Sequence, residues 1–99
     1  MLKTERVGLY SLLPTVHTQA GFQVRVLNKD HFPAHVHVIK AGTYAKVRIA
    51  GNVTVYETNM SKRDFDAAKS IVAAQLDRCR KEWIARYGSL SLKPKTRQR

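Results

Sequence analysis

The chain has 99 residues, which suits one domain and is too short for two domains of ordinary size. Hydrophobic residues make up 43% and charged residues 25%, a balance typical of folded chains and not of disordered ones. No apolar run approaches the roughly 18 residues of a membrane span. The first residues lack the pattern of a secretory signal, and the single cysteine, Cys79, cannot form an internal disulfide. We therefore expect a cytoplasmic protein that contacts no membrane.

Positive charge is the strongest global feature of the sequence. Eighteen lysine and arginine residues face seven aspartate and glutamate residues, so the net charge is +11. The excess extends along the whole chain, and such a field attracts polyanions and speeds encounter with them. We expect association with nucleic acid, with RNA favoured over DNA. The alternative is a basic surface that only keeps the protein in solution.

The predicted elements begin after an N-terminal part, residues 1–13, which forms either an extension or an extra strand. Pro14 is expected to break the chain there. One α+β domain should then occupy residues 14–88. Apolar and polar residues alternate as in half-buried strands, separated by turn residues such as Gly42 and Gly51. The expected strands cover residues 21–27, 35–39, 44–49 and 53–57. The short connections predict an antiparallel meander of three to four strands.

A single long C-terminal helix is expected to follow these strands. Ser61 is a typical N-cap, and Gly88 fits the position just after a helix end. Apolar residues recur at steps of three and four, which predicts one stripe that packs on a face of the sheet. The stripe comprises Phe65, Ala68, Val72, Leu76, Cys79 and Trp83. Residues 89–99 are expected to form a basic C-terminal tail.

The segment from Asp30 to Val38 holds the strongest candidate for a functional site. His31, His35 and His37 fall within seven residues, and His35 and His37 should point to the same face of a strand because side chains repeat every two residues. One hypothesis is acid–base catalysis on a phosphodiester by His35 and His37, with Asp30 orienting one imidazole. No cofactor is needed for that chemistry.

Two other functions fit the same histidines. His31, His35 and His37 could ligate zinc or another divalent transition metal, and Asp30 could take the place of His31 or add a fourth ligand. The histidines could instead contact phosphates or bases without any catalysis. A structural alternative also stays open, in which they stand on the solvent side of a strand and have no role.

This histidine segment also carries a family resemblance. Asp30-His31, Pro33, His35 and His37 resemble the D-H-x-P-P-H-x-H signature of a family of small prokaryotic proteins of unknown function. The likeness covers about residues 14–88, and Ala34 departs from it because the family usually has a second proline there. The resemblance implies a compact α+β domain. Some members are described as toxin–antitoxin-like, which implies an acidic antitoxin-like protein as a partner.

Two groups of basic residues are candidates for phosphate contact. At 100° per residue, Lys62, Lys69 and Arg80 should form a row along one long helix. A solvated stripe beside the core is the alternative. The second group lies in the tail: Lys93, Lys95 and Arg97. Tyr44 and Tyr56 could stack on bases if they face outward.

The leading hypothesis is a nucleic-acid-associated basic protein acting on RNA as the toxin-like component of a toxin–antitoxin module. The alternatives are a small metal-binding protein and a non-catalytic protein-interaction module. An exposed strand edge would also permit a homodimer.

Overall fold

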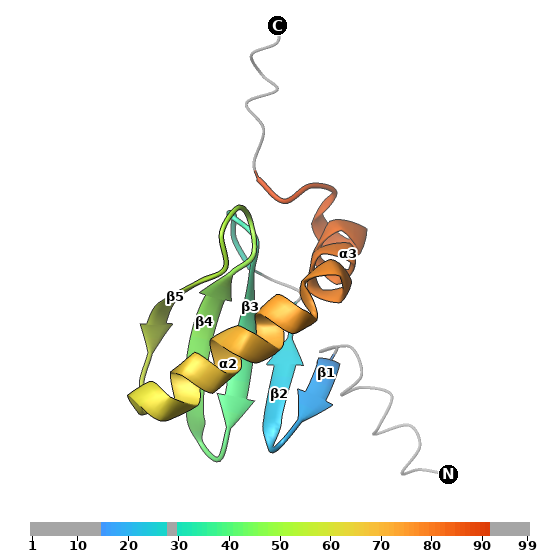
Figure 1. Cartoon of the computed structure of the whole chain (residues 1–99). Coiled ribbons are helices and arrows are strands. Elements are labelled where there is room, and N and C mark those ends of the chain that lie inside the picture. The colour runs from blue at the N-terminus through green and yellow to red at the C-terminus, as the bar shows by residue number, and fades with distance from the viewer. Residues whose placement is uncertain (1–14, 28–29, 92–99) are drawn as a thin grey trace, which may run out of the picture.

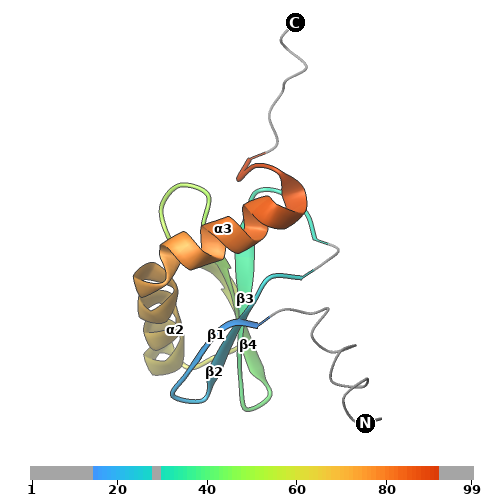
Figure 2. The ribbon, with the colours of Figure 1, turned by 90° about the vertical axis from the view of Figure 1, so that its right-hand side faces the viewer.

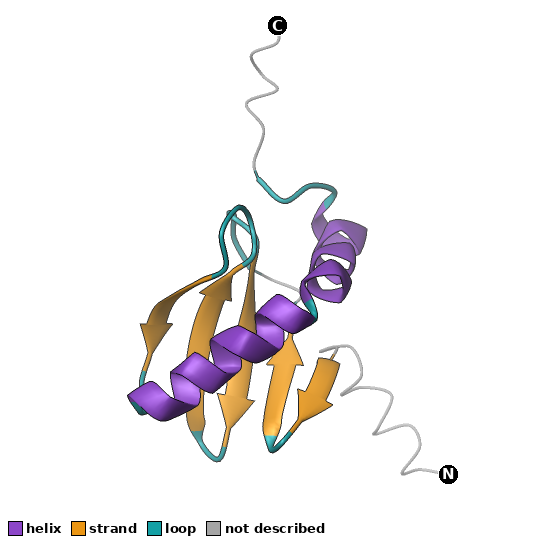
Figure 3. Ribbon diagram, viewed as in Figure 1, coloured by secondary structure: helices purple, strands orange, loops and turns teal. Residues whose placement is uncertain are grey.

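The computed structural model describes residues 15–27 and 30–91, which form a five-stranded antiparallel sheet and two helices (Figures 1 and 3). The strands lie in the sheet in chain order, as a meander. They are β1 (Thr15–Gln19), β2 (Phe22–Arg25), β3 (His35–Lys40), β4 (Thr43–Arg48) and β5 (Thr54–Thr58). The helices are α2 (Lys62–Ala74) and α3 (Leu76–Tyr87). The predicted α+β class and the predicted meander are therefore confirmed.

The sheet has one strand more than the three or four expected from the sequence. The additional strand is β1, which pairs with β2 through a two-residue turn at Ala20 and Gly21. Both turn residues have positive φ angles, 49° and 85°, which match the twist of a tight hairpin. The sequence did not predict this turn, because the first position is an alanine, whereas glycine or asparagine is usual where φ is positive. Residues 1–13, where an extra strand was considered, lie outside the described residues.

Small apolar side chains fill the core on the face of the sheet that α2 covers. Val24, Val38 and Ala45 are directly opposite one another on adjacent strands, and each has no exposed surface. Ala68 and Val72 of α2 are equally buried in the same core. Burial of apolar surface at about 25 cal/mol per Å² is the main force that holds the helix to the sheet.

The predicted single helix is two helices, which meet at Gln75. The backbone of Gln75 has φ −110° and ψ 24°, outside the helical region, and α3 begins at the next residue. Figures 1 and 2 show that α2 crosses one face of the sheet. The helix α3 runs in a different direction and lies on the side of the sheet where β1 is, which it contacts. The apolar stripe nevertheless continues through the break, since Cys79 and Trp83 of α3 are fully buried. No proline or glycine marks the break, so the sequence favoured one helix.

Helix ends agree with the capping residues. Ser61 accepts a hydrogen bond from the backbone N–H of Asp64 and caps α2, as expected. Gly88 follows α3 with a φ of 86°, the left-handed conformation that ends many helices. Neither helix is long and apolar enough to cross a membrane.

Candidate Asp–His site

The candidate site lies where the connection between β2 and β3 meets the start of β3. Asp30, in this connection, places one carboxylate oxygen 2.9 Å from Nε2 of His35 and the other 2.8 Å from Nε2 of His37. Side-chain exposure is 8% for Asp30, 2% for His35 and 16% for His37. One carboxylate therefore joins two imidazoles in a nearly enclosed cluster, which we call the Asp–His site (Asp30, His35 and His37).

The backbone fixes the tautomer of His35. Nδ1 of His35 lies 2.9 Å from the carbonyl oxygen of Pro33, and since a carbonyl can only accept, Nδ1 carries the proton. Nε2 of His35 is close to Asp30 but is not aligned with it for a hydrogen bond, so this buried nitrogen has no hydrogen-bond partner among the described residues. Nε2 of His37, in contrast, donates to the carboxylate of Asp30.

Burial and proximity set the ionisation of this pair. Burial favours the neutral form of Asp30, but the hydrogen bond with His37 and the two nearby imidazoles outweigh it and lower the pKa of Asp30 below its usual value. Burial also lowers the pKa of His37, and the hydrogen bond to Asp30 offsets only part of that effect. The carboxylate is thus charged at neutral pH beside a neutral His37.

An aromatic cluster holds the β2–β3 connection in place. The ring of Phe32 packs edge-on against Trp83 and Tyr87 of α3, at centroid distances of 5.7 and 6.0 Å. The Tyr87 hydroxyl donates a hydrogen bond to the carbonyl of Leu27 at the start of the connection. Trp83 also lies 5.4 Å from the ring of His35. Sequence reasoning placed Trp83 in the core, which is confirmed, but the helical stripe gave no sign that it also supports the site.

Residues just after α3 complete this support. The backbone N–H of Ala34 donates to the carbonyl of Leu90, and the indole N–H of Trp83 donates to the carbonyl of Ser89. Ser89 and Leu90, which the sequence pattern assigns to the tail, therefore contact the domain. The carbonyl of Ala34 accepts a bond from Ile49 and so ties the same connection to the end of β4.

Around the Asp–His site, the sheet face opposite α2 carries polar and charged side chains. His37 is directly opposite Arg25 on β2 and Lys46 on β4, and Lys46 is opposite Glu57 on β5. Directly opposed residues share a face. His35 is opposite Arg48 in the same way. We call this surface the open face and define it by a set of residues: Arg25, His35, His37, Lys46, Arg48, Tyr56 and Glu57.

An exposed aromatic ring lies on the open face beside the site. Tyr56 of β5 is 40% exposed, and its ring lies 5.9 Å from that of His35. The guanidinium of Arg48 sits 5.4 Å from the Tyr56 ring centre, a cation–π arrangement that fixes both side chains. Tyr44, the other candidate for stacking, donates its hydroxyl to Glu57. A large ring, a guanidinium and the Asp–His site thus lie side by side.

His31 is the exception among the clustered histidines. Its side chain is 75% exposed, and its Nε2 lies 4.0 Å from Asp30. The side-chain atoms that converge within 4.8 Å of one another come from Asp30, His35 and His37. The structure therefore brings together the three residues predicted for acid–base chemistry. Of the predicted metal ligands, it groups His35 and His37 with Asp30 and leaves His31 outside the group. His17, the fourth histidine, lies on β1 and contacts Gln19.

The predicted basic row is divided by the break at Gln75. Lys62 and Lys69 lie on α2, where Lys62 pairs with Asp66 at 2.7 Å, and Arg80 lies on α3. Arg80 donates to the backbone carbonyls of Ile49 and Gly51, at 2.9 and 3.0 Å, so its guanidinium links α3 to the β4–β5 connection. The straight row is thus absent because the helix is not continuous. Lys93, Lys95 and Arg97 lie outside the described residues.

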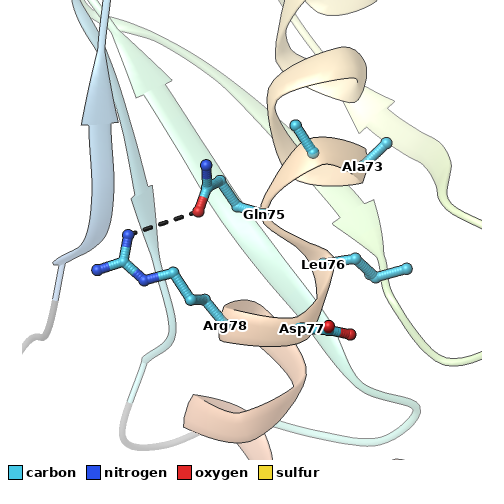
Figure 4. Close-up of a pocket in the computed structure, with 6 residues that line it drawn as sticks. Ala73, Gln75, Leu76, Asp77 and Arg78 are labelled. Carbon is cyan, nitrogen blue, oxygen red and sulfur yellow. Dashed lines mark hydrogen bonds between the residues drawn. The ribbon is translucent and has the colours of Figure 1, made fainter.

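A shallow depression of about 320 Å³ lies apart from the Asp–His site, at the junction of the two helices (Figure 4). Its lining runs from Ala73 to Arg78, and Arg78 bonds to Gln75 across it. No histidine lines this depression. It follows from the break between the helices and has no group suited to acid–base chemistry other than Asp77.

Comparison with known proteins identifies a family. A model of the family described as "Domain of unknown function (DUF4160)" matches residues 21–84, which include the whole Asp–His site and most of the sheet. No curated protein and no solved structure matches the chain.

Proposed function

The chain belongs to the DUF4160 family, whose description states no activity, and we propose from the site that it binds single-stranded RNA on its open face. The observation that carries the proposal is the position of Tyr56, exposed and held by Arg48 next to the Asp–His site. Aromatic rings on a sheet surface are platforms for unpaired bases, and each stacked base contributes about 1–3 kcal/mol.

Charge on the open face supports phosphate binding. Arg25, Lys46 and Arg48 share the face, and of these only Lys46 is paired with a described carboxylate, Glu57, at 3.3 Å. The net charge of +11 adds a long-range attraction. In this proposal the guanidinium of Arg48 holds a phosphate while Tyr56 stacks on the adjoining base.

The experiment compares two large side chains of similar exposure on different surfaces. Tyr56 is 40% exposed on the open face and Ile84 is 43% exposed on α3. Binding of a fluorescent single-stranded RNA is measured by anisotropy for wild type, Tyr56→Ala and Ile84→Ala at several salt concentrations. We expect Tyr56→Ala to weaken binding about tenfold and Ile84→Ala to leave it unchanged. Wild-type affinity should fall steeply as salt rises. No binding at low salt, or equal effects of both substitutions, would overturn the proposal.

Proton transfer at the Asp–His site is a narrower proposal within this one. His37 donates its Nε2 proton to Asp30, which leaves Nδ1 of His37 as an acceptor for the 2′-hydroxyl proton of bound RNA. The 2′-oxygen would attack the phosphorus, the bond to the 5′-oxygen would break, and water would protonate the leaving oxygen. DNA lacks this nucleophile, which is why RNA is the favoured substrate. His35 is buried and its Nδ1 donates to the carbonyl of Pro33, so it does not contact the substrate.

Cleavage separates the narrower proposal from the broader one. Wild-type protein is incubated with RNA and DNA of the same sequence, and His37→Ala serves as the inactive variant. RNA ending in a 2′,3′-cyclic phosphate, formed by wild type only, is the expected product. If RNA is bound but never cleaved, the catalytic role falls and RNA binding stands.

A toxin-like role would further require an acidic protein that blocks the open face. Loss of RNA binding when the two proteins are mixed would reveal such a partner.

A further inference from the structure

The buried nitrogen of His35 is the least satisfied polar atom of the Asp–His site. Nδ1 donates to the Pro33 carbonyl, so Nε2 is the ring nitrogen that faces Asp30. This nitrogen lies 2.9 Å from a carboxylate oxygen of Asp30 in a side chain that is only 2% exposed, without a hydrogen bond between the two atoms. A metal cation bound here would be attracted to the carboxylate and would give the buried nitrogen a partner.

The remaining features of the cluster match those of a transition-metal site. Donor atoms from Asp30, His35 and His37 lie within 4.8 Å of one another. Two imidazole nitrogens and one carboxylate oxygen are a usual set for zinc, with a further position left for water. Metal-binding histidines also donate their second ring N–H to a carbonyl or carboxylate, as His35 does to Pro33.

We propose that Asp30, His35 and His37 bind one divalent transition-metal ion. Zinc is the ion used as the probe. Neighbouring ligand atoms of tetrahedral zinc are about 3.3 Å apart when the bonds are near 2.0 Å. The two oxygens of the Asp30 carboxylate lie 2.9 Å from Nε2 of His35 and 2.8 Å from Nε2 of His37, so these side chains would have to move apart slightly to admit the ion. Nitrogen ligands favour zinc and its neighbours over magnesium and calcium, which prefer oxygen.

Metal binding and the proton-transfer role use His37 in different ways. A metal ion on Nε2 replaces the hydrogen bond to Asp30, so one ring cannot serve both roles in the same state. The metal site does not depend on RNA binding, since its ligands lie in the cluster and not at Tyr56 or Arg48. Failure of either proposal can therefore be recognised without the other.

The test measures zinc in protein purified without a histidine tag. Wild type, His37→Gln, Asp30→Asn and His17→Gln are stripped with chelator, mixed with zinc chloride, passed through a desalting column and analysed for metal. Glutamine at position 37 retains an N–H for Asp30, so the fold should persist even if a substitution of the buried His35 does not fold. His17, on β1 and bonded to Gln19, is the matched control outside the cluster.

We expect one zinc ion per chain in wild type and in His17→Gln. Affinity, measured by competition with a chromophoric chelator, should fall by at least about tenfold in His37→Gln and Asp30→Asn. Cobalt should give the visible absorption bands of a tetrahedral site in wild type and not in His37→Gln. Absence of bound zinc in the wild type would overturn the proposal, and so would equal losses in His17→Gln and His37→Gln. In those cases the Asp–His site is a structural framework that holds the β2–β3 connection and binds no metal.

Discussion

The carboxylate of Asp30 lies 2.8 Å from Nε2 of His37, although the two residues are seven positions apart in the chain. They meet because the β2–β3 connection returns over the strand that follows it and is held there by Phe32 against α3. The loop residue supplies the charge, and the strand supplies the imidazoles. The site therefore depends on α3 as well as on the histidine segment.

Substitution of Asp30 by asparagine should destabilise the metal-free protein. The amide is nearly the same size as the carboxylate, but it would remove the charged acceptor to which Nε2 of His37 donates in a nearly enclosed cluster. The loss should be about 1–3 kcal/mol. Urea unfolding in the presence of chelator measures it. Asp66→Asn, which removes an exposed partner of Lys62, is the control and should cost less than about 1 kcal/mol. Equal losses in the two variants would show that the Asp–His contact adds no stability.

Arg80 is predicted to act in folding and not in RNA binding. Its guanidinium donates to the carbonyls of Ile49 and Gly51, and bonds from a charged group contribute about 1.5–3 kcal/mol. Arg80→Ala should therefore lower the free energy of unfolding by about that amount while RNA affinity at low temperature changes as little as in Lys81→Ala. Lys81 is an exposed neighbour on the same helix. If Arg80→Ala is as stable as the wild type but binds RNA much more weakly, the prediction is wrong and Arg80 contacts phosphate.

The thiol of Cys79 should be inert in the native protein. Cys79 has no exposed surface, and burial raises the pKa of its thiol to about 11. Since the thiolate is the reactive form, the native protein should not react with Ellman's reagent at about pH 8, where the group is protonated. The same protein in urea should release one equivalent of the coloured product. Rapid reaction without denaturant would show that α3 often moves away from the core and exposes Cys79.

Much of the fold followed from local patterns, because these patterns report directly on backbone geometry. Alternation identified β2 to β5, and Ser61 and Gly88 located the outer ends of the two helices. The break at Gln75 could not be predicted because it results from packing. The helix α2 packs on β4 and β5, whereas α3 contacts β1. No local signal exists in a stretch that contains neither proline nor glycine.

The Asp–His site was predictable in composition but not in geometry. The spacing of His35 and His37 placed them on one face, and Asp30 was a neighbour in the sequence. Only the path of the connection decides that Asp30 reaches both rings while His31 points to solvent. Tyr56 was ambiguous because the register shift between β4 and β5 near Val47 changes how β5 side chains alternate.

The most direct test of RNA binding on the open face is to map the contacts by ultraviolet cross-linking and mass spectrometry. A single-stranded RNA containing photoreactive uridine is irradiated with the wild-type protein, and the modified peptides are identified. Cross-links should concentrate in the peptides of β3 to β5, with Tyr56 the main residue, and should decrease in Arg48→Gln. Cross-links confined to α2, α3 or the C-terminal residues, with none on β5, would contradict the assignment of the open face as the RNA-binding surface.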